Sequence, residues 1–134
     1  MNFILRISSL LLLTVVLFGS CKKKKGETIN EENLVVAINP DPGSGNATAT
    51  GPTYSFSITI QSTMPPQGVD VQVEYRQESN NSVLFSQTLS STTSPINVNI
   101  NNIPTAAAGT VTVKVTSKSK ASNTVTKTFR LVRK

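Results

Sequence analysis

The sequence contains no histidine and no tryptophan, and its 134 residues include a single cysteine. Without histidine, the usual general base near neutral pH and the commonest metal-binding side chain are both missing. A single cysteine allows neither an intrachain disulfide nor a zinc site built from thiolates. We therefore expect a fold held by its apolar core alone, with no metal and no cofactor.

The chain also lacks an apolar run long enough to cross a membrane. The longest one, Leu10–Phe18, is much shorter than the roughly 20 residues of a transmembrane helix, but it fits the apolar region of about 7 to 15 residues in a signal peptide. Arg6 supplies a positive charge ahead of it. Residues 1–20 are therefore interpreted as an export signal, with an uncleaved anchor helix as the alternative.

The only cysteine, Cys21, directly follows Phe18, Gly19 and Ser20 at the end of the apolar run. This arrangement resembles the lipobox of bacterial lipoproteins, in which leucine is commonest where Phe18 stands. The resemblance implies that Gly19 and Ser20 are the small residues required by the signal peptidase, which cuts before Cys21. It also implies that the thiol of Cys21 receives a diacylglycerol and that the new amino terminus is acylated. Several acyl chains hold a protein on a bilayer for long periods.

An ordinary secretory signal is the alternative, and it would leave a free thiol near the new terminus. A lone reactive thiol is a liability in an oxidising compartment, which favours lipidation. No cofactor is needed in either interpretation.

Four consecutive lysines, Lys22–Lys25, follow the cysteine, and the stretch up to Asn33 has no apolar period. Residues 21–33 are therefore interpreted as a lipidated cysteine with a flexible spacer. Each lysine would contribute about 1 kcal/mol near an anionic membrane surface. A charge run that only keeps the spacer solvated is an equally good interpretation.

The residue after the cysteine bears on location. In lipoproteins of bacteria with two membranes, an aspartate there favours retention in the inner membrane, so Lys22 implies the outer membrane. Lysine-rich stretches after the cysteine are also common in lipoproteins of the Bacteroidota, which the chain resembles in this feature. Whether the protein faces the cell surface or the periplasm stays open.

From residue 34 onward, apolar and polar residues alternate, and no segment shows a helical apolar stripe. The pattern predicts an all-β fold, a seven-stranded antiparallel immunoglobulin-like sandwich over residues 34–134. The expected strands are Leu34–Ile38, Tyr54–Ile60, Val69–Tyr75, Val83–Leu89, Ile96–Ile100, Thr110–Thr116 and Asn123–Val132.

Residues two apart share one side of a strand, so the alternation predicts which side chains face the core. The inward residues are expected to be Tyr54, Phe56, Ile58, Ile60, Val69, Val71, Val73, Tyr75, Ile96, Val98, Ile100, Val111, Val113 and Val115. Lys127 breaks the pattern, because it is in phase with Val125 and Phe129. Either a bulge near 126–128 or an edge position that lets Lys127 reach water would resolve this.

The C-terminal segment, residues 108–134, resembles the closing hairpin of bacterial immunoglobulin-like and fibronectin type III-like modules. The matching residues are Ala108, Gly109, Val111, Val113, Asn123, Thr124, Lys127, Thr128 and Phe129. The resemblance implies an architecture and no activity. The chain departs from these modules at two places. Val111 stands where tyrosine is usual, so the hydrogen bond of a tyrosine corner is not available there. Lys118 and Lys120 stand in a turn that often carries aspartate, which disfavours a calcium site in that turn.

The net charge of +6 is unevenly distributed. Residues 26–78 contain one arginine and all seven acidic residues, whereas residues 79–134 contain seven basic residues and no acid. These seven form a candidate patch for lipopolysaccharide phosphates, acidic glycans or an acidic envelope protein: Lys114, Lys118, Lys120, Lys127, Arg130, Arg133 and Lys134. The alternative is a solvated edge whose lysines block strand pairing. The export signal and the lack of interleaved aromatics disfavour nucleic acid.

These features predict a lipid-anchored envelope protein that acts as a non-enzymatic structural or interaction module. A surface glycan-binding or adhesin-type protein is the alternative, although tryptophan is absent and both tyrosines fall on inward positions. An enzyme would need a serine and lysine pair or two close carboxylates. Glu31 and Glu32 are the only neighbouring acids, and they lie in the predicted spacer.

Overall fold

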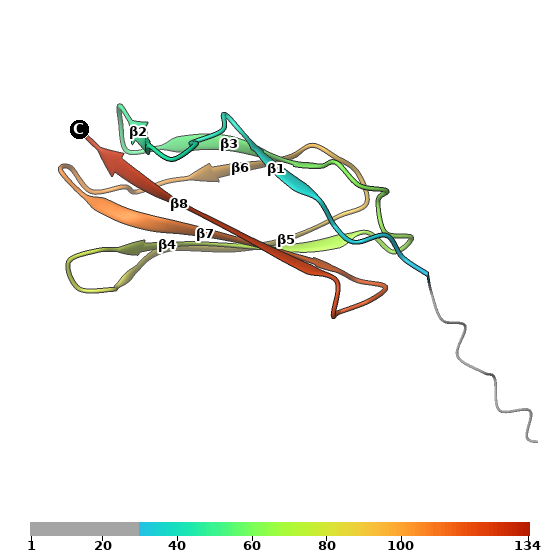
Figure 1. The fold of residues 1–134 in the computed structure, drawn as a ribbon. Coiled ribbons are helices and arrows are strands. Elements are labelled where there is room, and N and C mark those ends of the chain that lie inside the picture. The colour runs from blue at the N-terminus through green and yellow to red at the C-terminus, as the bar shows by residue number, and fades with distance from the viewer. Residues whose placement is uncertain (1–29) are drawn as a thin grey trace, which may run out of the picture.

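A computed structural model describes residues 30–134, which form two β-sheets stacked face to face (Figure 1). The strands are β1 Val36–Asn39, β2 Asn46–Ala49, β3 Tyr54–Ile60, β4 Val69–Gln77, β5 Val83–Ser91, β6 Ile96–Ile100, β7 Ala108–Ser117 and β8 Thr124–Arg133. One sheet has the order β1-β3-β6 and the other the order β2-β8-β7-β4-β5. Within residues 30–134, no helix has the length and apolar character needed to cross a bilayer.

The predicted all-β sandwich is confirmed, and its strand order is compatible with an immunoglobulin-like arrangement. The structure has eight strands, however, where seven were expected. The additional strand is β2, in which Ala47 and Ala49 face the core. Alanine has a low β propensity and a small side chain, so this strand lacks the period-two signal of large apolar residues. One pair departs from the predicted antiparallel arrangement, because β2 pairs with β8 in parallel.

The path of the chain explains the parallel pair. Strand β1 pairs with β3 in the three-stranded sheet, and the loop over residues 40–45 then carries the chain across to the five-stranded sheet. There β2 pairs with the last part of β8, from Arg130 to Arg133. The first segment of the domain therefore contributes to both sheets.

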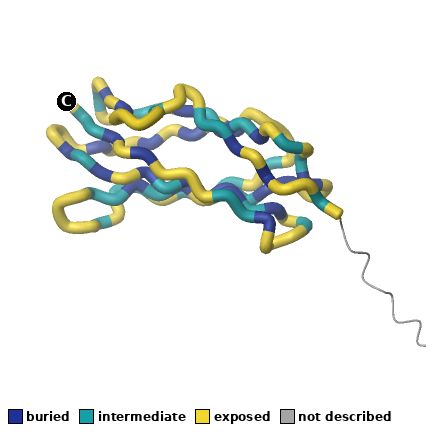
Figure 2. Tube along the Cα trace, in the orientation of Figure 1, coloured by how far each residue is buried: buried dark blue, intermediate teal, exposed yellow. Residues whose placement is uncertain are grey.

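The core lies between the sheets and follows the predicted alternation. Buried and exposed residues alternate along most strands, as the tube in Figure 2 shows. Of the predicted inward residues, all are buried except Tyr54, which is half-buried. Phe56 from one sheet meets Phe129 from the other edge to face, with ring centroids 5.6 Å apart. Such pairs add to the stabilisation that burial of apolar area provides.

Lys127 is accommodated at an edge and not by a bulge. The pairing of β7 with β8 runs without a register shift from Ala108↔Val132 to Thr116↔Thr124, so a bulge near 126–128 is ruled out. Strand β2 covers β8 only from Arg130 onward, which leaves the part around Lys127 without a neighbour on that side. Lys127 is exposed there, and it interrupts the apolar face without being buried.

Candidate functional site

The predicted lipidation residue Cys21 and the predicted cleavage-site residues Gly19 and Ser20 lie outside the described residues. The anchor therefore stays a prediction. The structure does place the point at which the chain enters the sandwich. Asn30 lies at the end of the sandwich opposite the C-terminus (Figure 1). We call this the entry end, and the end that holds the C-terminus and the β4–β5 turn is the far end.

A group of hydrogen bonds fixes the incoming chain at the entry end. The carboxylate of Glu31 accepts hydrogen bonds from Nδ2 of Asn123, at 2.5 Å, and from Oγ of Ser117, at 2.9 Å. Nδ2 of Asn123 also donates to the backbone oxygen of Glu32, at 2.8 Å, and its Oδ1 accepts from the backbone N–H of Leu34, at 2.9 Å. Asn123 and Ser117 are both buried. We call these five residues the entry clasp.

The side chain of Glu32 makes a further contact, with the loop between β3 and β4. Its Oε2 accepts a hydrogen bond from the backbone N–H of Thr63, at 2.9 Å. This bond stabilises the charged carboxylate and lowers the pKa of Glu32, and a second hydrogen bond from the Thr63 side chain acts in the same direction. The loop between β3 and β4 is thereby tied to the incoming chain.

The sequence does not predict the entry clasp, because Glu31 and Glu32 lie in the polar stretch that indicates a flexible spacer. Adjacent acids in a polar stretch usually indicate a solvated segment, and Asn123 follows a turn, where asparagine is normally exposed. The partners of Glu31 lie 86 and 92 residues away in the sequence. No local signal connects residues so far apart.

The two adjacent carboxylates of Glu31 and Glu32 contact different parts of the domain. Glu31 accepts from Asn123 and Ser117, whereas Glu32 accepts from the backbone of Thr63, so they are directed to different partners. Among residues 30–134, no three acidic, histidine or cysteine side chains gather in a way that could hold a metal ion. In this part of the chain, the acids act in hydrogen bonds that fix the fold.

The seven basic residues of the predicted patch are spread over the domain and do not share one surface. Lys118 and Lys120 lie in the β7–β8 turn at the entry end, where the backbone N–H of Lys118 donates to the oxygen of Gly68. Lys114 lies midway along β7 on the outer face of the five-stranded sheet, whereas Lys127 lies on the core side of β8. The remaining three follow near the end of β8, at the far end: Arg130, Arg133 and Lys134.

Two of the far-end residues have partners already. The guanidinium of Arg130 makes two hydrogen bonds to the carboxylate of Glu78, at 2.6 and 2.9 Å. These bonds lower the pKa of Glu78 and raise that of Arg130. Nη1 of Arg133 donates to the backbone oxygen of Ile103, which holds this side chain against the protein. The basic residues that face solvent with most freedom are therefore lysines.

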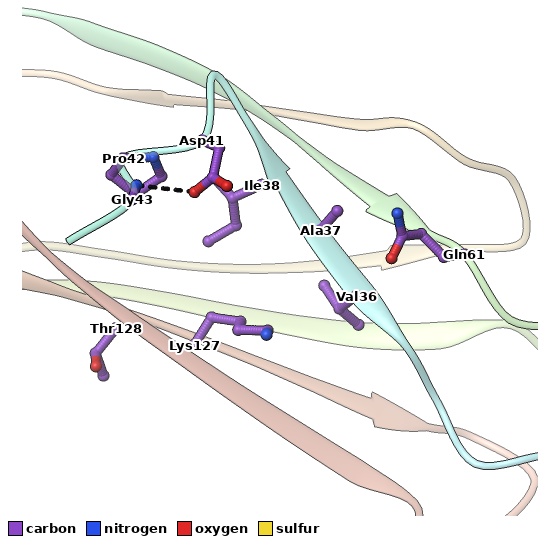
Figure 3. Close-up of a pocket in the computed structure, with 9 residues that line it drawn as sticks. All are labelled: Val36, Ala37, Ile38, Asp41, Pro42, Gly43, Gln61, Lys127 and Thr128. Carbon is purple, nitrogen blue, oxygen red and sulfur yellow. Dashed lines mark hydrogen bonds between the residues drawn. The ribbon is translucent and has the colours of Figure 1, made fainter.

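A groove of about 450 Å³ lies between the edges of the two sheets, where β1 faces β8. Figure 3 shows Lys127 between β8 and β1, with Val36 and Ile38 on the opposite side. Asp41 also lines the groove, but its carboxylate accepts a hydrogen bond from the backbone N–H of Gly43, at 2.8 Å. The walls of the groove are mixed, and polar side chains stand beside the aliphatic ones: Asp41, Gln61, Lys127 and Thr128.

Both tyrosines pack into the core, Tyr75 fully and Tyr54 in part. Tyr75 is fully buried, and Tyr54 packs against Phe56 and Phe129, with ring centroids 6.1 and 6.2 Å apart. Burial raises the pKa of both tyrosines. Because sugar-binding sites generally stack an aromatic face against the ligand, the described residues give little support to glycan recognition.

No protein-family model matches the chain, and no curated protein sequence is significantly similar to it. Function is therefore inferred from the sequence motifs and from the fold.

Proposed function

We propose that the protein is a lipid-anchored, non-enzymatic module of the bacterial cell envelope, held on the outer membrane through Cys21. The sandwich would act through contacts with other envelope components. The observation that carries the proposal is the position of the only cysteine, directly after Gly19 and Ser20 at the end of a short apolar run. The entry clasp would then set the orientation of the domain, because it fixes the incoming chain at one end of the sandwich.

The spacer keeps the domain close to the membrane. Eight residues separate Cys21 from Asn30, so the fully extended chain between them, nine residue steps long, reaches about 30 Å. Lys118 and Lys120 are the basic residues of the domain at the entry end. They would join Lys22–Lys25 near the anionic headgroups, where each charge contributes about 1 kcal/mol. The far end would be the part most accessible to other envelope components.

A substitution at Cys21 tests the anchor. We expect Cys21→Ala to abolish incorporation of a labelled fatty acid and to move the protein from the membrane fraction into the soluble fraction. Ser20→Ala is the matched control, because it keeps a small residue before the cysteine and should retain both the label and the membrane association. Unchanged labelling and sedimentation of the Cys21→Ala protein would refute the proposal. Protease treatment of intact cells then distinguishes the cell surface from the periplasmic face.

A further inference from the structure

Strand β5 is the unprotected edge of the sandwich. It lies at the end of the five-stranded sheet, where β4 is its only neighbour among the described residues. Its nine residues, Val83–Ser91, contain no charged residue and no proline. In an antiparallel sheet, alternate residues direct their backbone N–H and C=O groups away from the neighbour. These groups form a template on which a further strand can pair.

The other edges of the sandwich carry features that oppose strand pairing. Strands β1 and β2 have only four residues each, and Pro40 follows β1 directly. Strand β6 has five residues and begins just after Pro95. The uncovered part of β8 carries Lys127. Strand β5 has a register shift near its start, at Leu84, but it pairs regularly with β4 from Phe85 to Ser91. The contrast within one domain singles out this regular part of β5, which is uncharged and open.

The side chains of β5 are also incompletely covered. The small sheet has three strands and the large one five, and the core-side residues Phe85 and Leu89 of β5 are only half-buried. Val83, at the start of the strand, is 46% exposed. A partner strand beside β5 would bury more of this apolar surface while satisfying the open backbone groups.

We infer that β5 pairs antiparallel with β5 of a second copy of this chain, so that the two large sheets join into one. The sequence of the strand is self-complementary in the register centred on Gln87. Phe85 then lies opposite Leu89 of the other copy on the core side, and Ser86 lies opposite Thr88 on the outer side. Because β5 has no charge, the pairing brings no like charges together.

The pairing is compatible with two anchors in one membrane. Antiparallel strands place the entry ends of the two copies at opposite ends of the pair. A ten-residue strand is about 33 Å long, and each spacer reaches about 30 Å, so a pair lying along the membrane can keep both anchors inserted. This role on the membrane rests on the proposed function, and it would raise the effective concentration of the copies. The pairing itself needs no anchor.

Cross-linking of the full chain in cells tests the geometry. In the inferred register, residue 87 lies opposite itself, with Cβ atoms about 4.5–5.5 Å apart. We expect Gln87→Cys to give a dimer with a short thiol-specific cross-linker. Asn97→Cys, an exposed position on the edge strand β6, is the matched control and should give no more dimer than the parent chain, whose only cysteine is Cys21. A Gln87→Cys dimer yield equal to that of the control would overturn the inference. The inference would also fail if the Gln87→Cys chain were cross-linked only to a protein of different mass and not to a second copy of itself.

Charge reversal tests the register and the identity of the partner. Ser86→Lys with Thr88→Lys places two like-charge pairs across the junction, at exposed positions that tolerate lysine, and should reduce co-purification of two differently tagged copies roughly tenfold. The same pair of positions changed to glutamate should show the same loss. Mixing the lysine and glutamate variants should restore the complex, because each lysine then faces a glutamate. Asn97→Lys with Asn99→Lys on β6 is the matched control and should leave co-purification unchanged.

Two results would overturn the inference: no loss of co-purification in the lysine variant, or no recovery of co-purification in the mixture of lysine and glutamate variants.

The Cys21→Ser chain separates this inference from the proposed function. If Gln87→Cys still cross-links when Cys21→Ser is also present, the pairing holds without the anchor. A loss of membrane association that leaves cross-linking intact would then contradict neither the strand pairing nor its register.

Discussion

The entry end and the far end of the sandwich are held by different kinds of contact. At the entry end, the buried polar groups of Asn123 and Ser117 find partners in Glu31 and in the incoming backbone. At the far end, the ring of Tyr75 packs against the backbone of Gly109, and its hydroxyl is buried without a hydrogen-bond partner.

The difference decides how each end responds to the loss of a polar group. A buried group with partners stabilises the fold, and its removal leaves those partners unsatisfied. A buried group without a partner destabilises the fold through lost hydration, so its removal is favourable or neutral. The two ends should therefore respond with opposite sign, and the far end should be more sensitive to added volume.

The largest effect is expected for Gly109→Ala at the far end. A Cβ at this position would lie 2.3 Å from the backbone oxygen of Arg76 and 2.4 Å from Cε2 of Tyr75. The β4–β7 pairing fixes that oxygen, so the strands must separate, at a cost of about 3 kcal/mol in the free energy of unfolding. Gly51→Ala is the control, because nothing lies within 4 Å of its Cβ. Urea unfolding measures both, and equal midpoints would contradict the close packing at Gly109.

The second effect is expected for Asn123→Ala at the entry end. The substitution removes three side-chain hydrogen bonds of the entry clasp and leaves the N–H of Leu34 without its partner. We expect a loss of about 2 kcal/mol in the free energy of unfolding and faster proteolysis of residues 30–34. Asn97→Ala, at an exposed position on β6, should change neither quantity. If both variants behaved alike, the entry clasp would have no energetic role.

The sequence predicted the strands that carry large alternating apolar residues, and the structure confirms them. Strand β4 shows the reason. Its β-branched residues stand at every second position, so only one face of the strand can be the buried one: Val69, Val71 and Val73. Strand β2 was missed because alanine carries little of this signal. The pairing of Glu31 with Asn123 was missed because it depends on how distant segments meet.

The seven basic residues also show what the sequence does not predict about a candidate site, namely which side chains share a surface. They are close in sequence because they lie on one hairpin, but each strand of that hairpin has ten residues and is about 33 Å long. Lys118 and Arg130 therefore lie at opposite ends of the domain. Alternation also places Lys114 and Lys127 on opposite faces of the sheet. Closeness in sequence along strands of this length does not predict a shared surface.

The third prediction concerns the unpaired hydroxyl at the far end. Tyr75→Phe removes a buried polar group that has no partner, so the free energy of unfolding should stay the same or rise by up to about 1 kcal/mol. Tyr54→Phe, at a half-buried tyrosine, is the control and should have little effect. Thermal and urea unfolding measure the change. A clear destabilisation by Tyr75→Phe, similar in size to that of Asn123→Ala, would remove the contrast between the two ends.

The smallest effects are expected from the exposed carboxylates, Glu32 at the entry end and Glu78 at the far end. Both have a pKa below the ordinary value, Glu32 through its hydrogen bonds from Thr63 and Glu78 through those from Arg130. Folding therefore favours their charged forms. This contribution is fully present above the ordinary pKa of a glutamate, and it is lost as the pH falls through the lower folded values. Stability should decrease below about pH 4.

Glutamine variants separate the two contributions. Glu32→Gln and Glu78→Gln should each make unfolding less dependent on pH between about pH 5 and pH 2. Salt then distinguishes the ends, because the Debye length falls to about 3 Å at 1 M ionic strength and screens the exposed pair of Glu78 with Arg130. At that ionic strength Glu78→Gln should match the parent chain near neutral pH, whereas Glu32→Gln should still be less stable, because its partner is a neutral backbone N–H. An equal response of both variants to salt would show that the two ends hold their carboxylates in the same way.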